Sequence, residues 1–343
     1  MSAATLSAPQ PAPAGAAGTG ATAAPARLNP RRIAWLVGSR VGGAVLVLWI
    51  AITLTFIAIR LMPGDTVSLL LGENRDDPVL RAETIERWGL DQPVWVQYFT
   101  YLARIPSGDL GISYTLRRPV ADLIVAGAGP TFQLTAAATI AAIVLAVLGA
   151  VLTTAAIPGL RPLAATLELV VLSAPPFWLA IVLLSVVSFR LGWFSIVQQG
   201  SWQALVLPTA ALALPIGAYL TQILVEGIEK AMAQPFVTTA RSRGISRFAA
   251  RTRHALRHAS LPALHMVGLI VGSLLGGAVI VEQVFGRAGL GQLAVDAVTV
   301  KDVPLILGIT LVSTAAFVAV STLVDIIGAL VDPRVRLSRG CAR

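Results

Sequence analysis

Six uncharged, apolar runs alternate with polar segments along this chain. Each run is close to or above the ~18 residues that a helix needs to cross a hydrocarbon core of roughly 30 Å. None shows the apolar and polar alternation over ~10 residues that marks a transmembrane β-strand. The pattern therefore predicts six transmembrane helices, at residues 41–59, 131–157, 169–189, 204–225, 263–281 and 303–324.

Composition supports an all-α integral membrane protein. Hydrophobic residues make up 56% of the 343 residues, charged residues make up only 13%, and the mean hydropathy is +0.78. These values exclude an ordinary soluble domain of this length. The pattern divides the chain into a tail, a first transmembrane helix, an extracytoplasmic cap segment, a core with helices 2 to 6 and a second tail, at residues 1–30, 31–61, 62–130, 131–331 and 332–343.

The two sides of the membrane differ in charge. If both termini lie on one side, that side holds 16 of the 26 Lys and Arg residues but only 5 of the 17 Asp and Glu residues. Short loops rich in Lys and Arg stay in the cytoplasm, so we expect both termini and the loop at residues 226–262 to be cytoplasmic. This topology accounts for the pI of about 10.9 without a nucleic-acid partner.

The first 30 residues are a low-complexity segment of Ala, Pro, Gly, Ser and Thr that cannot bury a core, which predicts a disordered tail. A cleavable signal peptide is the alternative, but the apolar run at 41–59 is longer than a signal h-region of ~7 to 15 residues. Cys341 is the only cysteine, which excludes an intrachain disulfide and a cysteine metal site within this chain.

Residues 62–130 form the one sizeable segment expected outside the membrane on the outer face. Gly and Pro punctuate short amphipathic pieces there, which predicts a small cap of helices and turns. The segment holds no His and no Cys, and its carboxylates are scattered, so no nucleophile is paired with a base. A catalytic domain is not expected.

The polar island at residues 235–262 carries six arginines and two histidines between two uncharged runs. So large a cytoplasmic loop predicts a docking site for a partner; contact with lipid headgroups is the alternative. His254 and His258 have the i, i+4 spacing of metal ligands. Because arginines surround them and no third ligand is near, we expect no metal.

Eight motifs, in this order, carry a family resemblance. They resemble the dipeptide/oligopeptide ABC importer permeases, and the long outer segment resembles the first of the two permease types that such systems combine. The resemblance implies a type I ABC importer permease-like fold with six transmembrane helices. The motifs are RLMPGD (60–65), WGLDQPVWVQY (88–98), GDLGISY (108–114), FVTTARSRGI (236–245), RHALRHASLP (253–262), VFGRAGLGQLAVDAV (284–298), KDVP (301–304) and VDPRVR (331–336).

In this family a short cytoplasmic coupling helix before the fifth span seats in a groove of the ATPase. Gly244 would permit the positive φ that ends this helix. The chain departs from the family pattern at Gln222, Val225 and Pro235, although Pro235 suits a first helical turn. The resemblance implies ATPase-coupling roles for Phe236, Thr239, Ala240, Arg241, Arg243 and Gly244.

Polar groups at membrane depth are costly unless they line a cavity or find partners. Interfacial solvation is the alternative for the carboxylates, and a bond to a neighbour for His265. Prolines 175, 176, 208 and 215 are expected to interrupt the third and fourth helices. Gly272 and Gly276 have GxxxG spacing, typical of close packing between helices, here between two permeases. We expect the translocation pathway to include Gln133, Glu168, Pro175, Trp178, Gln222, His265, Glu282 and Gln283.

The resemblance implies partners: a second permease, two P-loop ATPases, an extracytoplasmic binding protein and membrane lipid. The chain has no GxxxxGK[ST] loop, so we expect it to bind no cofactor and to be no enzyme, with ATP and Mg at the partner ATPases. The solute is expected to be a dipeptide or oligopeptide, with glutathione, nickel chelates or another small solute as alternatives. The cap residues expected to contact the binding protein are Asp65, Asp91, Gln92 and Asp109.

Two other classes fit less well. A secondary transporter shows inverted repeats and carboxylates within spans, and no repeat is visible here. An intramembrane hydrolase needs a serine and a histidine within hydrogen-bond reach. Ser273 and His265 are two turns apart on one helix, and there is no GxSxG motif.

Overall fold

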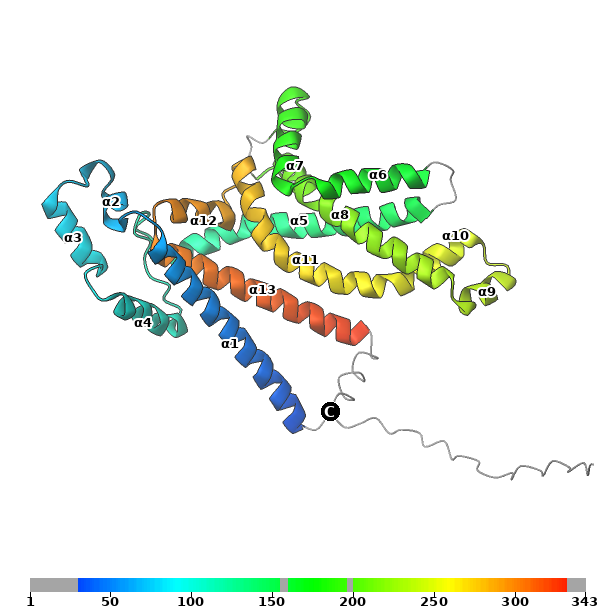
Figure 1. Ribbon diagram of the computed structural model, residues 1–343, viewed down its shortest axis with the longest axis horizontal. Coiled ribbons are helices and arrows are strands. Elements are labelled where there is room, and N and C mark those ends of the chain that lie inside the picture. The colour runs from blue at the N-terminus through cyan, green and yellow to red at the C-terminus, as the bar shows by residue number, and fades with distance from the viewer. Residues whose placement is uncertain (1–29, 155–159, 196–199, 332–343) are drawn as a thin grey trace, which may run out of the picture. The chain divides into compact units, whose positions relative to one another are not determined.

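The computed structural model describes residues 30–154, 160–195 and 200–331. The predictions for residues 1–29 and 332–343 therefore lie outside the described residues. The chain divides into two units at Gly43 and Ala44, and the first long helix begins in the smaller unit. The larger unit holds the remaining elements, which are coloured by residue number in Figure 1.

The described residues are helical, apart from turns and one isolated bridge between Ile112 and Pro119. Four helices are each long and apolar enough to span a membrane. They coincide with the first, second, fourth and sixth predicted runs, so those predictions are confirmed. The four helices are α1 (Pro30–Leu61), α5 (Val120–Thr154), α8 (Trp202–Met232) and α13 (Val303–Val331).

The fifth run lies within α11 (Leu256–Phe285), which has 30 residues. A helix of that length is about 45 Å long at 1.5 Å per residue, enough to cross a bilayer. Several α11 side chains are outside the described residues. A shorter helix, α12 (Leu290–Thr299), follows it.

The third run, at 169–189, is broken at Pro175 and Pro176, so the interruption predicted from these two prolines is confirmed. It forms α6 (Leu160–Ser173) and α7 (Pro176–Val182), followed by the π-helical η3 (Leu183–Arg190), and the two arms meet at 103°. Pro175 lacks an N–H and disfavours helical backbone in the residue before it, so two successive prolines stop α6. Pro176 then starts α7 at a position where its missing N–H costs nothing.

The fourth run behaves differently, and the expected interruption there is wrong. Pro208 and Pro215 both lie inside α8, which continues through them. Close packing holds α8 against α5: a Cβ on Gly149 would lie 2.7 Å from Thr221 Oγ1, and one on Gly217 would lie 2.9 Å from Leu145 Cβ. Only glycine allows the two backbones to approach this closely.

Two apolar clusters mark the opposite ends of α5. One joins the start of α5, at Ile124, to α1, α12 and α13. The other joins the far part of α5, at Ala150, to the last turns of α8 and the first turns of α11. The 26 residues between Ile124 and Ala150 correspond to about 39 Å along the helix axis, which is close to the thickness of a whole bilayer.

Gly272 is used within the chain. A Cβ at this position would overlap the Phe317 ring of α13, so the glycine allows α11 to pack against α13. A Cβ built on Gly276 would have no atom within 4 Å. Its predicted role at an interface between two permeases stays a prediction.

The cap consists of three short α-helices and two single 3-10 turns. Two of the α-helices begin at an aspartate cap: Asp77, for example, accepts hydrogen bonds from Val79 N and Leu80 N, with Pro78 following as the first helical residue. The third follows Pro93 and has no side-chain cap. α5 begins before residue 131, so its first turns lie inside the segment predicted as cap. The elements of the cap are α2 (Thr66–Leu71), η1 (Gly72–Asn74), α3 (Pro78–Trp88), α4 (Val94–Arg104) and η2 (Ile105–Ser107).

Candidate functional site: a coupling helix, a polar knot and a clasped cap

A short helix follows α8 in the sequence. α9 (Pro235–Ser242) begins with Pro235 as its first residue, and the chain leaves it through Gly244, whose φ is +85°. Only glycine adopts that backbone conformation without strain. The predicted start and stop of this helix are therefore both present in the structure.

One side of α9 is anchored to the rest of the chain. Val237 is buried, and the Phe236 ring lies 5.0 Å from the His258 ring. α10 (Arg247–Ala249) and the π-helical η4 (Ala250–Ala255) lead from α9 into α11, and Ser246 caps α10 by accepting a hydrogen bond from Ala249 N. Because η4 packs against both α8 and α9, a force on α9 reaches two long helices.

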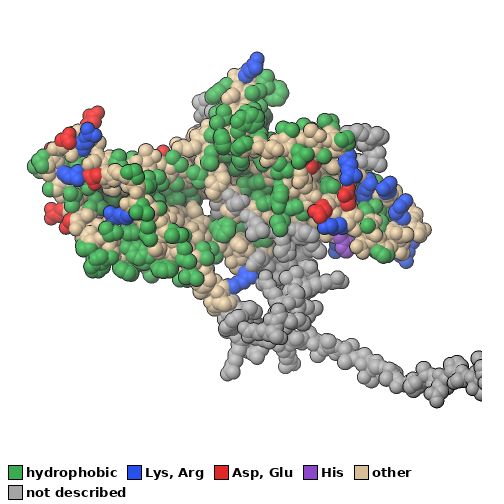
Figure 2. Space-filling view, in the orientation of Figure 1, with side chains coloured by type: hydrophobic (Ala, Val, Ile, Leu, Met, Phe, Trp, Pro, Cys, Tyr) green, Lys and Arg blue, Asp and Glu red, His purple; other side chains and the backbone are tan. Residues whose placement is uncertain are grey.

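The other side of α9 is open. Thr239, Arg241, Arg243 and Gly244 are exposed, and Ala240 is half-buried. Within the described ranges, no arginine from 241 to 257 forms an ion pair with a carboxylate. Figure 2 shows Lys and Arg side chains gathered at this end of the molecule. Exposed guanidinium groups without an ion pair, next to a glycine that leaves room for close approach, are complementary to an acidic groove on a partner protein.

Phe248, in α10, is a residue that sequence reasoning did not assign. Its side chain is 60% exposed, and it lies two residues after the Ser246 cap. An exposed aromatic side chain beside arginines is typical of a binding hot spot. The signal available in the sequence was an aromatic residue inside an otherwise polar, basic island.

At the far end of α11, Glu282 forms a polar knot with α5 and α12. Its side chain is 0% exposed. Its two carboxylate oxygens accept hydrogen bonds from Thr131 Oγ1 at 2.6 Å and from Gly291 N at 2.7 Å. Thr131 Oγ1 also accepts one from Leu290 N at 2.8 Å. A Cβ at Gly289 would overlap the carboxylate. The knot fixes three helices to one another.

Two more of the predicted pathway residues lie on the helices of this knot. Gln133 and Gln283 are exposed, and Gln133 accepts a hydrogen bond from the Arg287 guanidinium at 3.4 Å. Arg287 is buried, and its Nε has no hydrogen-bond partner. Burial lowers the pKa of Arg287, and the negative charge of Glu282 opposes this shift.

Glu168 and Gln222 line a separate cavity of about 290 Å³ between α5, α6 and α8. Thr153 donates a hydrogen bond to Glu168 at 3.3 Å. The structure thus places the predicted pathway residues in different regions. Pro175 and Trp178 lie at the exposed bend before and within α7. The side chain of His265 lies outside the described residues.

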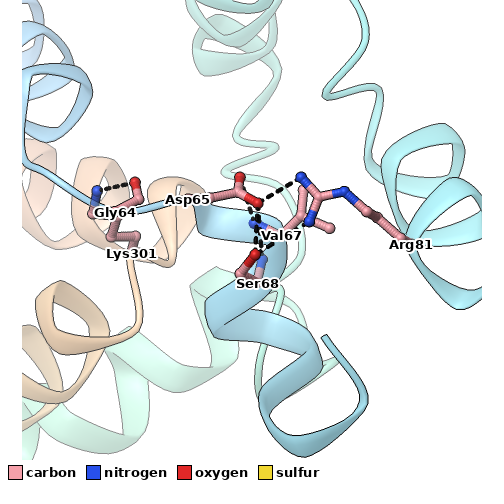
Figure 3. Close-up of polar contacts among 6 residues, drawn as sticks. All are labelled: Gly64, Asp65, Val67, Ser68, Arg81 and Lys301. Carbon is pink, nitrogen blue, oxygen red and sulfur yellow. Dashed lines mark hydrogen bonds and ion pairs between the residues drawn. The ribbon is translucent and has the colours of Figure 1, made fainter. Parts of the chain in front are cut away.

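Two residues of the KDVP motif, Lys301 and Asp302, hold the cap through hydrogen bonds, and Figure 3 shows Lys301. Lys301 has a φ of +54°, which is rare for a residue with a side chain. Its Nζ donates hydrogen bonds to the carbonyl oxygens of Met62 and Gly64, each at 2.6 Å, and Figure 3 shows the bond to Gly64. Asp302 is fully buried and accepts hydrogen bonds from Ser113 Oγ at 2.6 Å and from Thr115 N at 3.1 Å. Sequence reasoning assigned neither residue a role, because their partners are remote in the chain.

The predicted cap residues have different surroundings. Asp65 caps α2 and pairs with Arg81 at 2.7 Å (Figure 3). Partial burial would raise the pKa of Asp65, but hydrogen bonds from Ser68, Arg81 and the Val67 amide outweigh it and lower the pKa. Asp91, Gln92 and Asp109 are exposed.

Tyr114 lies between the cap and the Asp302 clasp. Its ring packs 4.7 Å from Trp88. Burial, together with the Asp302 carboxylate, raises the pKa of Tyr114 to about 12. The phenol is therefore uncharged at any physiological pH.

A membrane-spanning helical core with a small basic helix at one end and a clasped cap at the other has the architecture of a transporter permease. The chain belongs to the binding-protein-dependent transport system inner membrane component family. The family model matches residues 160–337, and the model of its N-terminal region matches residues 33–135. The chain is thus a multi-pass inner-membrane permease subunit of an ABC importer with the type I fold.

Two relatives and one solved structure are similar to this chain. The glutathione transport system permease protein GsiC of Escherichia coli (strain K12) is 33% identical over 300 residues, covering 87% of this chain and 97% of GsiC. GsiC of Shigella boydii serotype 4 (strain Sb227) is 32% identical with the same coverage. The crystal structure of an amino acid ABC transporter with histidines matches with a TM-score of 0.50 at 20% identity, covering 61% of this chain and 94% of that one. That likeness supports the fold.

Proposed function

We propose that this chain imports short peptides, with glutathione as the second candidate, as one of two permeases driven by two P-loop ATPases. An extracytoplasmic binding protein delivers the solute, and both chain termini face the cytoplasm. The chain binds no cofactor and hydrolyses nothing, so ATP and Mg act at the ATPases. The observation that supports this proposal most directly is α9, a short helix between Pro235 and Gly244 with one anchored face and one open basic face.

α9 is built to transmit movement. The end of α8 and the start of α11 touch closely, since a Cβ on Gly227 would lie 2.7 Å from Ala259 Cβ. Rigid contact of this kind passes displacement along packed helices rather than absorbing it. ATP binding would close the ATPases, move α9, and rock α8 and α11 against the second permease. The pathway would then open alternately to each side.

Two solute classes have support. The motif resemblance is to dipeptide and oligopeptide permeases, whereas the similar curated proteins are named as glutathione permeases. Glutathione is itself a tripeptide, with carboxylates and an ammonium group, so a pathway for short peptides suits both. Nothing in the described residues favours a nickel chelate over these.

Uptake by the complete complex tests this proposal. The four membrane-associated subunits would be reconstituted in proteoliposomes with ATP inside and the binding protein outside, and offered a labelled dipeptide, an oligopeptide and glutathione in parallel. We expect ATP-dependent accumulation of at least one of them. Accumulation that continues without ATP but follows an ion gradient would overturn the importer mechanism in favour of a secondary transporter.

A further inference from the structure

Helix α4 of the cap carries an apolar stripe that no described part of the chain covers. Trp95 and Phe99 are 66% and 60% exposed, and Ala103 continues the same line at i, i+4 and i+8. The opposite side of α4 packs into the core through Tyr98, Tyr101, Leu102 and Ile105. Gln97, Thr100 and Arg104 form a polar strip along a third side of the helix.

The contacts of α4 place it at the depth of the membrane. The Tyr98 hydroxyl is 2.6 Å from Thr53 Oγ1 of α1, and the Tyr98 ring lies 5.3 Å from the Phe56 ring. Thr53 is eight residues before Leu61, the last residue of α1, which corresponds to about 12 Å along the helix. The contact is thus made with the part of α1 that spans the membrane.

The outer boundary of the hydrocarbon core can be located on α1. Arg60 is the first charged residue after the apolar run, and its guanidinium donates a hydrogen bond to Gln97 of α4. Leu54 and Ile57 are exposed apolar side chains on α1 just before Arg60, as expected for a helix surface in lipid. With the boundary between Ile57 and Arg60, Thr53 lies about 6 to 10 Å inside it. That is the depth at which an interfacial amphipathic helix rests, about 5 to 10 Å.

We propose that α4 lies in the outer membrane interface, with the stripe of Trp95, Phe99 and Ala103 buried in lipid. Aromatic side chains concentrate at this depth. A water-soluble binding protein would find the stripe covered by lipid, whereas Asp91 and Gln92, just before α4, are exposed beside it. The cap is therefore held by lipid through α4 and by protein through the Lys301 and Asp302 clasp, and it serves as a fixed platform rather than a swinging lid.

Spin labels in the intact complex test this proposal. In a Cys341→Ser background, which removes the only native cysteine, single cysteines would replace Trp95, Phe99 or Thr100. The labelled permease would be assembled with its partners in lipid nanodiscs. We expect the labels at 95 and 99 to be relaxed more by oxygen, which concentrates in lipid, than by a water-soluble nickel chelate. The label at 100, on the polar strip, should show the reverse order.

Two results would overturn the proposal. Stronger relaxation by the nickel chelate at 95 and 99 would place the stripe in water. Labels relaxed by neither reagent, or immobilised on addition of the binding protein, would show that a protein covers it. Because the measurement needs neither solute nor ATP, it stands apart from the uptake assay, and either can fail without the other.

Discussion

The two ends of the permease use charged residues in opposite ways. At the cap end, Lys301, Asp302 and Glu282 are buried and hydrogen-bonded within the chain. At the α9 end, Arg241 and Arg243 are exposed and make no ion pair within the described residues. Buried, satisfied charges fix a structure, whereas exposed, unpaired charges are free to meet a partner. The buried charged groups named at the cap end thus find their partners within the chain, whereas the exposed arginines of α9 make no ion pair among the described residues.

Removing a buried acceptor at the cap end should have the largest effect. Asp302→Ala leaves the Ser113 hydroxyl and the Thr115 N–H unsatisfied, which costs about 3 kcal/mol. The matched control is Asp109→Ala, because Asp109 is exposed and accepts only from Gly111 N. Thermal unfolding in detergent should show a much lower midpoint for Asp302→Ala alone. Equal midpoints for the two variants would contradict a structural clasp.

The clasp also shows where sequence reasoning stops. The apolar runs predict the spans because any helix in lipid must be apolar over a fixed length, and the Pro and Gly flanking α9 predict its ends. The bonds from Lys301 to Gly64 and from Ser113 to Asp302 join residues 237 and 189 positions apart. No local pattern encodes such a pair.

The prediction that prolines interrupt the third and fourth helices is right for one helix and wrong for the other, because long-range packing decides the result. Pro175 and Pro176 break the third run, whereas Pro208 and Pro215 are absorbed by α8. An isolated proline is tolerated when neighbouring helices satisfy the freed carbonyl and hold the helix together. Those neighbours are known only from the packing. The sequence alone therefore could not distinguish a proline that breaks its helix from one that the helix accommodates.

Replacing glycine by alanine should change the free energy of unfolding in opposite directions in the polar knot and on an open helix surface. In Gly291→Ala the new Cβ would overlap the Val279 backbone and crowd the Glu282 carboxylate, and overpacking of this kind costs about 1 to 3 kcal/mol. In Gly42→Ala, on the exposed surface of α1 with no atom within 4 Å of the new Cβ, the change should stabilise the helix by up to about 1 kcal/mol. Chemical unfolding curves should move in opposite directions. A shift in the same direction would show that the knot is loose.

Charge reversal should affect the α9 end without unfolding it. Arg241→Glu removes an exposed, unpaired guanidinium, so stability should stay within about 0.5 kcal/mol of the wild type. Affinity for the ATPases should fall by about tenfold or more, equivalent to at least ~1.4 kcal/mol. Arg118→Glu is the matched control, because Arg118 is an exposed cap arginine that likewise makes no ion pair among the described residues. Titration of the ATPases onto the immobilised permease measures the affinity of each variant. Equal affinity for the two variants would contradict docking at α9.

The smallest effect concerns pH at the cap. Because hydrogen bonds and Arg81 lower the pKa of Asp65 in the folded state, the stabilisation from this carboxylate is present above its unfolded pKa of about 3.9 and is lost as pH falls through the lower folded value. The pair is partly exposed, so its contribution is below about 1 kcal/mol. The gap in melting temperature between wild type and Asp65→Asn should narrow as pH falls from 7 to 3. A gap that stays constant would show that the charge of Asp65 plays no part.

The most direct test of the difference between the two ends is purification of the permease from its native membrane in mild detergent, with mass spectrometry of the bound proteins. Two variants that alter the open face of α9, Gly244→Asp and Ala240→Glu, are purified in the same way. Gly192→Asp is the control, because Gly192 is also exposed, has a φ of +65° and has no atom within 4 Å.

We predict that the wild type and Gly192→Asp retain a second permease and P-loop ATPases, while the α9 variants lose only the ATPases. If the α9 variants keep their ATPases, α9 is not the coupling site. If the wild type comes out alone under conditions that preserve other complexes, the mechanism driven by partner ATPases is contradicted.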